Sequence, residues 1–300
     1  MKVLVTGAGG LVGRAVSIHC ATAGEEVSAF DHKTLDIADL ESVRSAVSAV
    51  RPDVVINCAA WTDVDGCETD PERARKANAR GPEVLASSCR EVDALLITIS
   101  TDYVFDGDKD GFYTQEDQPN PISVYGRSKL EGEERAQHAH ERTIVVRSGY
   151  IFGPGGKNFL STFLQRVRAG DRLKAISDMV GTPTYAPDLA QRLYQLAQVD
   201  RPGIYHVVNA GEGVSFEGFA RAALEITGLD PSLVQSTTLA ELKRPAPRPR
   251  NSRLRCLLSE RVGLAPLPDW QAALRRFIEL QSNEVAPRTL APSHADADLG

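Results

Sequence analysis

Short apolar runs alternate with amphipathic stretches through the first half of the chain. Continuous runs of four or five mostly apolar residues are typical of strands that a parallel sheet buries on both faces. The predicted strands lie at residues 3–5, 27–30, 54–57, 95–99 and 143–147. Helical spacing predicts helices at residues 11–23, 40–50 and 70–91, the last with a kink at Gly81-Pro82, and a helix that carries Tyr125 and Lys129. This alternation predicts an α/β fold with a doubly wound parallel sheet, the Rossmann arrangement, over residues 1–150.

The second half of the chain has a less regular pattern. It begins with the turn-rich break Gly153-Pro154-Gly155-Gly156 and predicts helices at residues 158–169, 186–198, 216–227 and 269–280 and a strand at 204–208. We expect residues 151–282 to form mainly a smaller α/β lobe, with a segment of about 180–208 that returns to the main sheet. Residues 283–300 are polar and rich in Pro and Ala, so we expect a disordered tail there.

A glycine-rich turn separates the first predicted strand from the first predicted helix. The glycines are Gly7, Gly10 and Gly13, and the helix begins with Leu11 and Val12. The first glycine permits a tight turn, the second lets the backbone approach a pyrophosphate, and the third lets helix and strand pack closely. The helix N-terminus adds unpaired N–H groups and a positive dipole end. In this strand–turn–helix context the pattern predicts a dinucleotide site.

The second predicted strand ends in residues that bear on the choice of cofactor. Asp31 stands where an acidic residue usually bonds the adenosine ribose, which favours NAD. His32 and Lys33 follow directly and could accept a 2′-phosphate, so the preference between NADH and NADPH stays open. Asp36 and Ile37 lie in a loop that either meets the adenine or is solvated.

Two more strand ends carry candidate site residues. Small residues Cys58, Ala59 and Ala60 follow the third strand and would let a cofactor approach closely. The fourth strand ends in Ser100-Thr101-Asp102-Tyr103. Ligands bind at the carboxyl ends of strands in open α/β sheets, so we expect these two stretches to face one site.

Tyr125 and Lys129 lie four residues apart, one turn along a predicted helix. An ammonium group close to a phenol favours the phenolate and lowers the phenol pKa from about 10. Such a tyrosine can exchange a proton with a sugar or alcohol oxygen. A lone pair of this kind is usually a surface pair, but the glycine-rich turn and the Ser100–Tyr103 stretch favour a catalytic one.

Composition and charge narrow the functional classes. The net charge of −6 argues against non-specific binding of nucleic acid. The chain has no apolar stretch of membrane-spanning length and no signal-peptide pattern, so we expect no membrane partner and a cytoplasmic location. The five cysteines include no Cys-x-x-Cys pair, which indicates reduced thiols and no metal site.

A local basic segment contrasts with this acidic background. Within residues 243–255 the chain has no acidic side chain and six basic ones, namely Lys243, Arg244, Arg248, Arg250, Arg253 and Arg255. With three interspersed prolines it reads either as an ordered loop suited to phosphate or as a solubilising linker.

Together these stretches resemble the extended short-chain dehydrogenase/reductase family and, within it, the dTDP-4-dehydrorhamnose reductase branch. The matching residues are 7–13, 57–65, 100–105, 124–130, 181–184 and 248–254. The resemblance implies a nucleotide-sugar substrate, a substrate-binding C-terminal lobe, and reduction of the C4 keto group of dTDP-4-dehydro-L-rhamnose by NADPH or NADH. It implies that Tyr125 donates the proton, Lys129 bonds the nicotinamide ribose and Thr101 holds the carbonyl. The substrate-binding residues would be Thr62, Asp102, Tyr103, Tyr150, Arg248, Asn251, Ser252 and Arg253.

The chain departs from the family pattern at three places. Tyr150 stands where the family often has tryptophan, and Asp178-Met179-Val180 replaces the usual Asp-Gln. Glutamates linked in some members to a metal-bridged homodimer have no counterpart near Arg14. These departures leave the exact sugar and the mode of homodimer formation open.

Two alternatives to this function stay open. The first is a reductase of another 4-keto-6-deoxy sugar nucleotide in a natural-product pathway. The second is a non-catalytic regulatory subunit like the methionine adenosyltransferase β subunit, which can keep the Tyr-x-x-x-Lys pair. Dehydratases of the wider family place Asp-Glu after the threonine, whereas Asp102 and Tyr103 follow Thr101 here. This difference favours a reductase.

Overall fold

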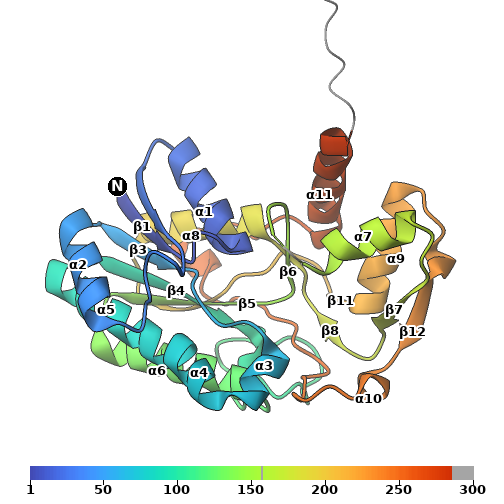
Figure 1. Cartoon of the computed structure of the whole chain (residues 1–300), viewed down its shortest axis with the longest axis horizontal. Coiled ribbons are helices and arrows are strands. Elements are labelled where there is room, and N and C mark those ends of the chain that lie inside the picture. The colour runs from blue at the N-terminus through green and yellow to red at the C-terminus, as the bar shows by residue number, and fades with distance from the viewer. Residues whose placement is uncertain (157, 286–300) are drawn as a thin grey trace, which may run out of the picture.

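A parallel six-stranded sheet organises the chain, and its strand order is β10-β5-β4-β3-β1-β2 (Figure 1). The computed structural model describes residues 1–156 and 158–285. The strands of this sheet are β1 (Lys2–Thr6), β2 (Glu26–Phe30), β3 (Val54–Asn57), β4 (Leu95–Thr101), β5 (Thr143–Ser148) and β10 (Gly203–His206). The predicted doubly wound α/β fold is confirmed.

The strands are apolar throughout because both faces of the sheet are buried. Val3 and Val5 of β1 face one hydrophobic core, whereas Leu4 between them faces another. Val54 and Val55 of β3 divide in the same way. Successive side chains of a strand point to opposite faces, so a continuous apolar run serves both cores.

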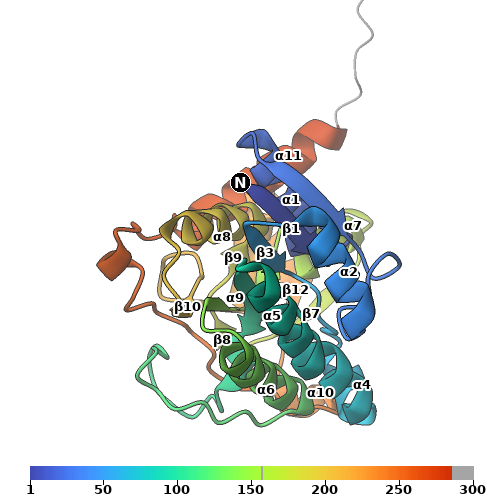
Figure 2. The same cartoon turned by 90° about the vertical axis from the view of Figure 1, so that its left-hand side faces the viewer.

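Helices cover both faces of the sheet (Figure 2). The first face packs against α1 (Leu11–Thr22) and α8 (Ala186–Val199) through Val16, Leu189 and Leu193. The second face packs against α2 (Leu40–Val50), α5 (Gly81–Val92) and α6 (Val124–Ala139). None of the helices in residues 1–156 and 158–285 is long and apolar enough to cross a membrane.

The predicted helix at residues 70–91 is divided in the structure. It forms α4 (Pro71–Arg75), a π-helical turn η1 (Lys76–Arg80) and α5, and α3 (Val64–Thr69) precedes it. The helix therefore changes its winding before Gly81 rather than at a proline kink. At Gly81 a Cβ atom would lie 2.5 Å from the end of the Ile37 side chain, so a larger residue there would have to displace that side chain.

The remaining elements form the smaller lobe around a separate hydrophobic core. Its residues include Phe152, Phe219 and Phe277. Its helices are α7 (Phe159–Arg168), α9 (Phe216–Thr227), α10 (Leu239–Leu242) and α11 (Trp270–Val285), with a 3₁₀ turn at Pro231–Leu233. Another 3₁₀ turn, Glu260–Val262, packs through Val262 against the core of the main sheet. Its strands pair two by two as β7 (Leu173–Ile176) with β12 (Val234–Thr237), β8 (Val180–Gly181) with β11 (Val214–Ser215), and β6 (Ile151–Phe152) with β9 (Thr184–Tyr185). These short strands were not predicted from the sequence.

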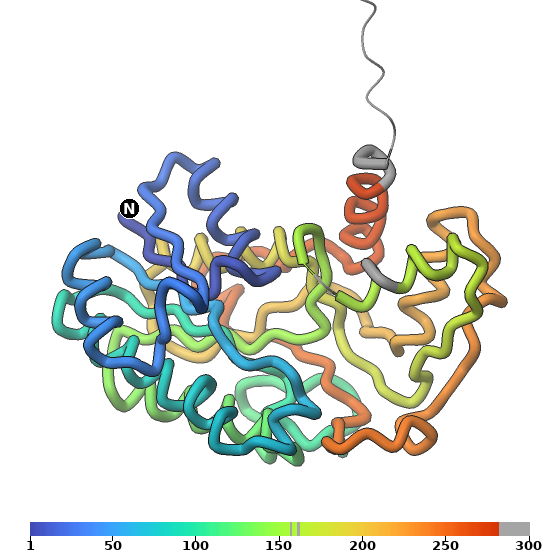
Figure 3. The backbone as a smooth tube through the Cα atoms, in the orientation of Figure 1, coloured from blue at the N-terminus to red at the C-terminus, as the bar shows by residue number. Residues whose placement is uncertain are grey.

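Two segments return from the lobe to the main sheet. The first contains α8 and β10, and β10 pairs with β5 at the sheet edge. The second is the chain after α10, which Figure 3 shows leaving the lobe and running back toward the sheet. It forms single bridges from Asn251 to Val180 and from Leu254 to Tyr113.

The end of the chain differs from the sequence prediction. Disorder was predicted from residue 283, but α11 continues as a helix to Val285, so the prediction is wrong for residues 283–285. Apolar residues of α11 such as Leu274 and Phe277 pack into the core of the lobe and anchor the helix. Residues 286–300 lie outside the part of the chain that the structure describes.

A buried ion pair links α6 to the sheet. Arg147 of β5 donates to Glu133 of α6 at 2.7 Å, and their side chains are only 4% and 2% exposed. Ser100 of β4 also donates to this carboxylate. These contacts tie α6 to β4 and β5 near the carboxyl ends of the two strands.

We predict that Glu133→Gln lowers the free energy of unfolding by about 3–5 kcal/mol, because it leaves the buried Arg147 guanidinium without a countercharge. Urea denaturation measures this loss. The control is Asp171→Asn, which removes an exposed ion pair with Arg166 and should cost less than about 1 kcal/mol. Equal losses in the two variants would contradict the structural importance of the Glu133–Arg147 pair.

Candidate active site

A trough made of two adjoining cavities runs along the carboxyl ends of the sheet strands. The cavities have volumes of about 490 and 530 Å³ and share Gly10, Cys58 and Ala60 in their walls. The shared wall lies between β1 and β3, where the strand order reverses. Such a switch point is the usual ligand site of a doubly wound sheet.

The glycine-rich turn forms a cradle at the middle of the trough. Gly7 has a φ of +67°, and a Cβ atom there would lie 2.6 Å from the backbone nitrogen of Ala59. At Gly13 a Cβ atom would lie 2.2 Å from the carbonyl oxygen of Gly7. Helix α1 begins at Leu11 without a side-chain cap, so its first N–H groups are open to a ligand. This cradle fits the pyrophosphate of a dinucleotide.

The larger cavity lies on the β2 side of the cradle and has Asp31, His32, Asp36 and Ile37 in its wall. The Asp31 carboxylate accepts hydrogen bonds from the backbone N–H groups of Lys33 and Thr34, at 2.9 and 3.1 Å. The first of these bonds is the main reason that the pKa of Asp31 lies below its usual value. The side chain of Asp31 is thus an ionised, fixed acceptor at the end of β2.

The residues of this cavity that sequence reasoning missed include three large side chains, namely Trp61, Arg73 and Lys76. The Arg73 guanidinium lies 4.3 Å from the centre of a Trp61 ring, and Lys76 pairs with Asp36 at 2.9 Å. A signal was present, because Trp61 follows the small residues after β3. Arg73 lies in α4 and Lys76 in the π-helical turn η1, and the sequence analysis assigned no ligand contact to the predicted helix that contains both.

Tyr125, Lys129 and Thr101 meet in the other cavity. Thr101 Oγ1 donates to Asp102 Oδ1 at 3.0 Å. The Thr101 hydroxyl also lies beside the Tyr125 phenol and lowers the phenol pKa in part. The Tyr103 ring stands edge-on to the Tyr125 ring, with 5.9 Å between centroids. The phenol therefore points at the end of β4, beside a second hydroxyl and a carboxyl group.

The electrostatics of Tyr125 differ from the sequence prediction. Burial raises the pKa of its phenol well above the ordinary value, so the prediction that Lys129 lowers it is wrong for this structure. The Lys129 Nζ instead donates to the carbonyl of Ile99 at 2.6 Å. Burial also lowers the pKa of Lys129 to about 8, against the raising effect of Glu133. Tyr125 is thus protonated at neutral pH.

Asn78 positions the helix that carries these residues, and sequence reasoning missed it. It accepts from the Trp61 N–H at 2.8 Å and donates to the Trp61 carbonyl and to Ser128 Oγ at 3.0 and 3.1 Å. Asn78 lies in the π-helical turn and is buried. A polar residue on the inner face of a predicted helix was the available signal.

Another part of the cavity wall carries hydroxyl groups that have no partner among the described residues. Ser148 Oγ and Tyr150 Oη are buried and have no hydrogen-bond partner among the described residues. Both residues line the cavity, together with Phe159 and Phe216. Unpaired buried polar atoms are costly, so this wall fits a ligand with several hydroxyl groups.

Among the described residues that line this cavity, Asp102 carries the one carboxyl group. Burial raises the pKa of Asp102 to about 6, although hydrogen bonds with Ser252 and Thr101 lower it in part. No group of His, Cys, Asp and Glu side chains able to hold a metal ion occurs within residues 1–156 and 158–285.

Comparison with known proteins agrees with this geometry. A family model described as the RmlD substrate binding domain matches residues 1–283. A dTDP-4-dehydrorhamnose reductase of Mycolicibacterium smegmatis is 43% identical to this chain, over 91% of this chain and 84% of the relative. This chain belongs to the dTDP-4-dehydrorhamnose reductase family.

Two further relatives are described with a cofactor or a substrate of their own. A Bacillus anthracis dTDP-4-dehydrorhamnose reductase solved in complex with NADP is 31% identical, with a TM-score of 0.89 over 93% of this chain and 99% of that one. A Streptomyces antibioticus protein, a probable dTDP-4,6-dihydroxy-2-methyloxan-3-one 4-ketoreductase, is 37% identical over 100% of this chain and 99% of the relative. The chain is thus an NAD(P)-dependent oxidoreductase of the reductase family.

Most residues predicted for the reductase site line the trough, including the named glycine, strand-end and helix residues. Those that line it are Gly7, Gly10, Leu11, Val12, Asp31, His32, Asp36, Ile37, Cys58, Ala59, Ala60, Thr62, Thr101, Asp102, Tyr103, Tyr125, Lys129 and Tyr150. Those that do not are Gly13, Lys33, Arg248, Asn251, Ser252 and Arg253. Lys33 is exposed, and Gly13 supports the cradle from behind.

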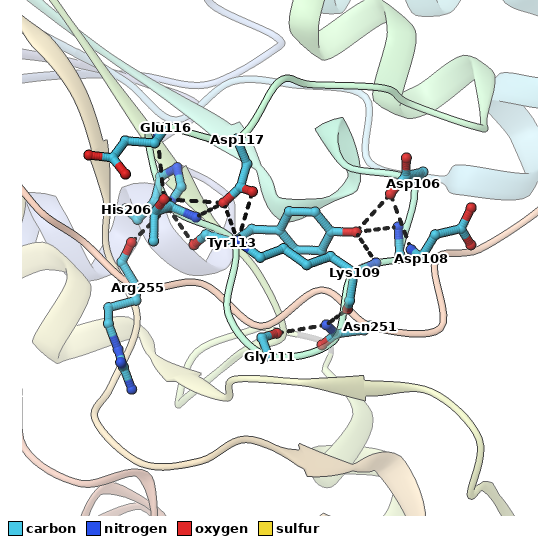
Figure 4. Close-up of polar contacts among 12 residues, drawn as sticks. Asp106, Asp108, Lys109, Gly111, Tyr113, Glu116, Asp117, His206, Asn251 and Arg255 are labelled. Carbon is cyan, nitrogen blue, oxygen red and sulfur yellow. Dashed lines mark hydrogen bonds and ion pairs between the residues drawn. The ribbon is translucent and has the colours of Figure 1, made fainter.

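The basic segment of the reductase is tied to protein groups. Arg248 donates to both oxygens of Asp65, at 2.9 and 3.0 Å, and holds the pKa of that carboxyl at about 2. Asn251 donates to the carbonyls of Lys109 and Gly111 at 2.6 and 2.7 Å (Figure 4). Ser252 interacts with the carboxyl group of Asp102, which lines the cavity that holds Tyr125. Contact of this segment with a substrate diphosphate stays a prediction.

We predict that kcat/KM of the reductase falls as pH rises through about 8. Burial depresses the pKa of Lys129, so the amine loses its positive charge near pH 8 instead of above 10. The measurement is a pH profile of NADPH oxidation from pH 6 to 10. Lys129→Arg keeps the charge and should lose this limb. A wild-type profile that stays flat to pH 10 would remove Lys129 from the mechanism.

Proposed function

We propose that this protein reduces the C4 keto group of dTDP-4-dehydro-L-rhamnose to give dTDP-L-rhamnose, with NADPH or NADH as reductant. The observation that carries this proposal is the meeting of Tyr125, Lys129 and Thr101 in a cavity that adjoins the glycine cradle. The names of relatives that share most of the chain support the same substrate class.

Each residue of this cavity has a separate role in the reduction. The bound dinucleotide supplies the hydride. Tyr125 gives its phenolic proton to the C4 oxygen, so the carbonyl gains a hydride at carbon and a proton at oxygen. Thr101 bonds the same oxygen and orients it toward the phenol. Lys129 holds the nicotinamide ribose through its Nζ.

We assign the part of the cavity wall that carries Ser148 and Tyr150 to binding of the sugar nucleotide. The unpaired hydroxyls of Ser148 and Tyr150 are placed to bond sugar hydroxyl groups. Phe159 and Phe216 supply apolar surface for a deoxy position or for the nucleotide base. The Asp102 carboxyl group and Tyr103 complete the polar side.

The proposal extends to organisation and location. We assign residues 1–150 with α8 and β10 to cofactor binding, and most of residues 151–282 to the substrate lobe. We place the reaction in the cytoplasm, where NADPH and nucleotide sugars are available. A homodimer without the metal bridge fits the absence of glutamates near Arg14.

A second candidate is a ketoreductase of a different dTDP-linked 4-keto sugar. The similarity to the Streptomyces antibioticus protein over the full chain favours keeping it. Relatives named as reductases, which match about nine-tenths of the chain, favour either reductase over a non-catalytic regulatory subunit. Comparison of kcat/KM across a panel of dTDP-4-keto sugars distinguishes the two reductases.

We predict that Tyr125→Phe lowers kcat by about 10²–10⁴-fold, because it removes the general acid. Affinity for NADPH, measured by fluorescence titration, should change little. The matched control is Tyr194→Phe, which removes a phenol that bonds Glu25 away from the trough and should leave turnover unchanged. Near-wild-type kcat in Tyr125→Phe would overturn the assigned proton donor.

We also predict that one NAD(P)H is consumed for each sugar reduced. Asp102 is followed by Tyr103 rather than glutamate, so the cavity lacks the second carboxylate that a dehydratase would use as base. NADPH absorbance and product are measured with dTDP-4-dehydro-L-rhamnose, and dTDP-glucose without added cofactor serves as the control. Elimination of water from dTDP-glucose, or turnover without net NADPH loss, would contradict the reductase assignment.

A further inference from the structure

A third cavity of about 400 Å³ lies at the carboxyl end of the edge strand β10. Its wall is formed by α8, the chain that follows β10, and the segment that returns from the lobe. It shares no residue with either cavity of the trough. Its volume is in the range of small-molecule sites.

The deep wall of this cavity contains a cation without a countercharge. Arg192 of α8 is only 4% exposed. Its Nε donates to Gln195 at 3.0 Å and its Nη2 donates to the carbonyl of Ala265. No carboxylate of residues 1–156 and 158–285 lies within ion-pair distance of it. A buried guanidinium without an anionic partner is costly, and an anion in the cavity would offset that cost.

The carboxylate that could most easily pair with Arg192 faces elsewhere. Asp188 lies one turn earlier on α8, at a spacing that often supports an ion pair. Its two oxygens accept from Arg276 at 2.9 and 2.6 Å, and one also accepts from Asn209 at 2.7 Å. Asp188 is therefore committed to these partners, and Arg192 is left facing the cavity.

His206 at the end of β10 contributes a second unsatisfied group to this wall. Its Nδ1 lies 3.2 and 3.1 Å from the carbonyls of Tyr113 and Arg255, so Nδ1 is the donor (Figure 4). Burial and the nearby Arg147 lower the pKa of His206 to about 4, so the ring is neutral at pH 7. Its Nε2 is then an acceptor, and it has no partner among the described residues.

Leucine side chains form one part of the remaining wall. Leu254, Leu264 and Leu267 line the cavity, as does Phe112, whose ring centre lies 4.2 Å from the Arg255 guanidinium. Charged residues of both signs, such as Glu260, are exposed at the rim and are screened by solvent. A buried cationic group in a wall that also contains leucine side chains suits a ligand with one anionic end and an apolar body.

We propose that this cavity is a second ligand site, which binds a small organic anion with its carboxylate or phosphate group on Arg192. The planar guanidinium presents paired N–H donors that suit either group. The apolar body of the ligand packs against the leucines. This site is independent of the reductase site, since the two share no lining residue.

Isothermal titration calorimetry on the full chain saturated with NADPH tests the proposal. The probes are benzoate, phenyl phosphate, the neutral amide benzamide, and inorganic phosphate. We expect benzoate or phenyl phosphate to bind at one site, at least tenfold more tightly than benzamide and inorganic phosphate. The preferred one of the two aromatic anions identifies the anionic group. No binding, or equal affinity for benzamide, would overturn the proposal.

Two variants locate the binding. Arg192→Met should weaken binding of the aromatic anion at least tenfold, whereas Arg201→Met, which removes an exposed arginine outside the cavity, should not change it. Leu257→Trp fills the cavity from its partly exposed wall without touching Arg192, and it should also weaken binding at least tenfold. If Arg192→Met does not fold, Leu257→Trp decides. Wild-type affinity in a folded Arg192→Met or in Leu257→Trp would overturn the site.

Discussion

The approach of two backbones at the switch point of the sheet is the constraint on which the trough depends. Gly7 lies so close to Cys58 and Ala59 that no side chain fits between them. Asn57 fixes the same edge, because it accepts from Thr6 at 2.7 Å and donates to Thr98 at 2.9 Å, joining the ends of β1, β3 and β4. The cradle and the wall of the cavity that holds Tyr125 are therefore parts of one rigid edge.

Helix α6 is registered against this edge by polar contacts along its inner face. Ser128 receives a hydrogen bond from Asn78, Lys129 donates to the carbonyl of Ile99, and Glu133 binds Arg147. These contacts follow one another along the helix, so a shift along its axis would break all of them. Tyr125, one turn earlier, thereby keeps its phenol at Thr101. Burial then holds that phenol protonated, which is the form that the proposed reduction uses.

The segment that returns from the lobe serves different sites along its length. Arg248 forms an ion pair with Asp65 of α3, and Ser252 interacts with the Asp102 carboxyl group. Leu254 lines the third cavity together with Arg192. Its arginines were grouped by their spacing in the sequence, but the fold separates them. A run of like charges in sequence therefore says little about which of them faces a ligand.

The sequence alone determined the features that depend on neighbouring residues. Periodicity predicts the central strands and most helices, and the glycine turn and the Tyr125–Lys129 spacing are local patterns that a single helix or turn satisfies. The tertiary structure decided what depends on distant residues. Asp65 and Arg248 form an ion pair although most of the chain separates them in sequence. Asn78 in the π-helical turn accepts a hydrogen bond from the Trp61 backbone, a contact that no local pattern predicts. The short paired strands of the lobe have too few residues to show a period. The pKa of Tyr125 and the missing countercharge of Arg192 also belong here, because burial and desolvation are properties of the packed protein and not of any stretch of its sequence.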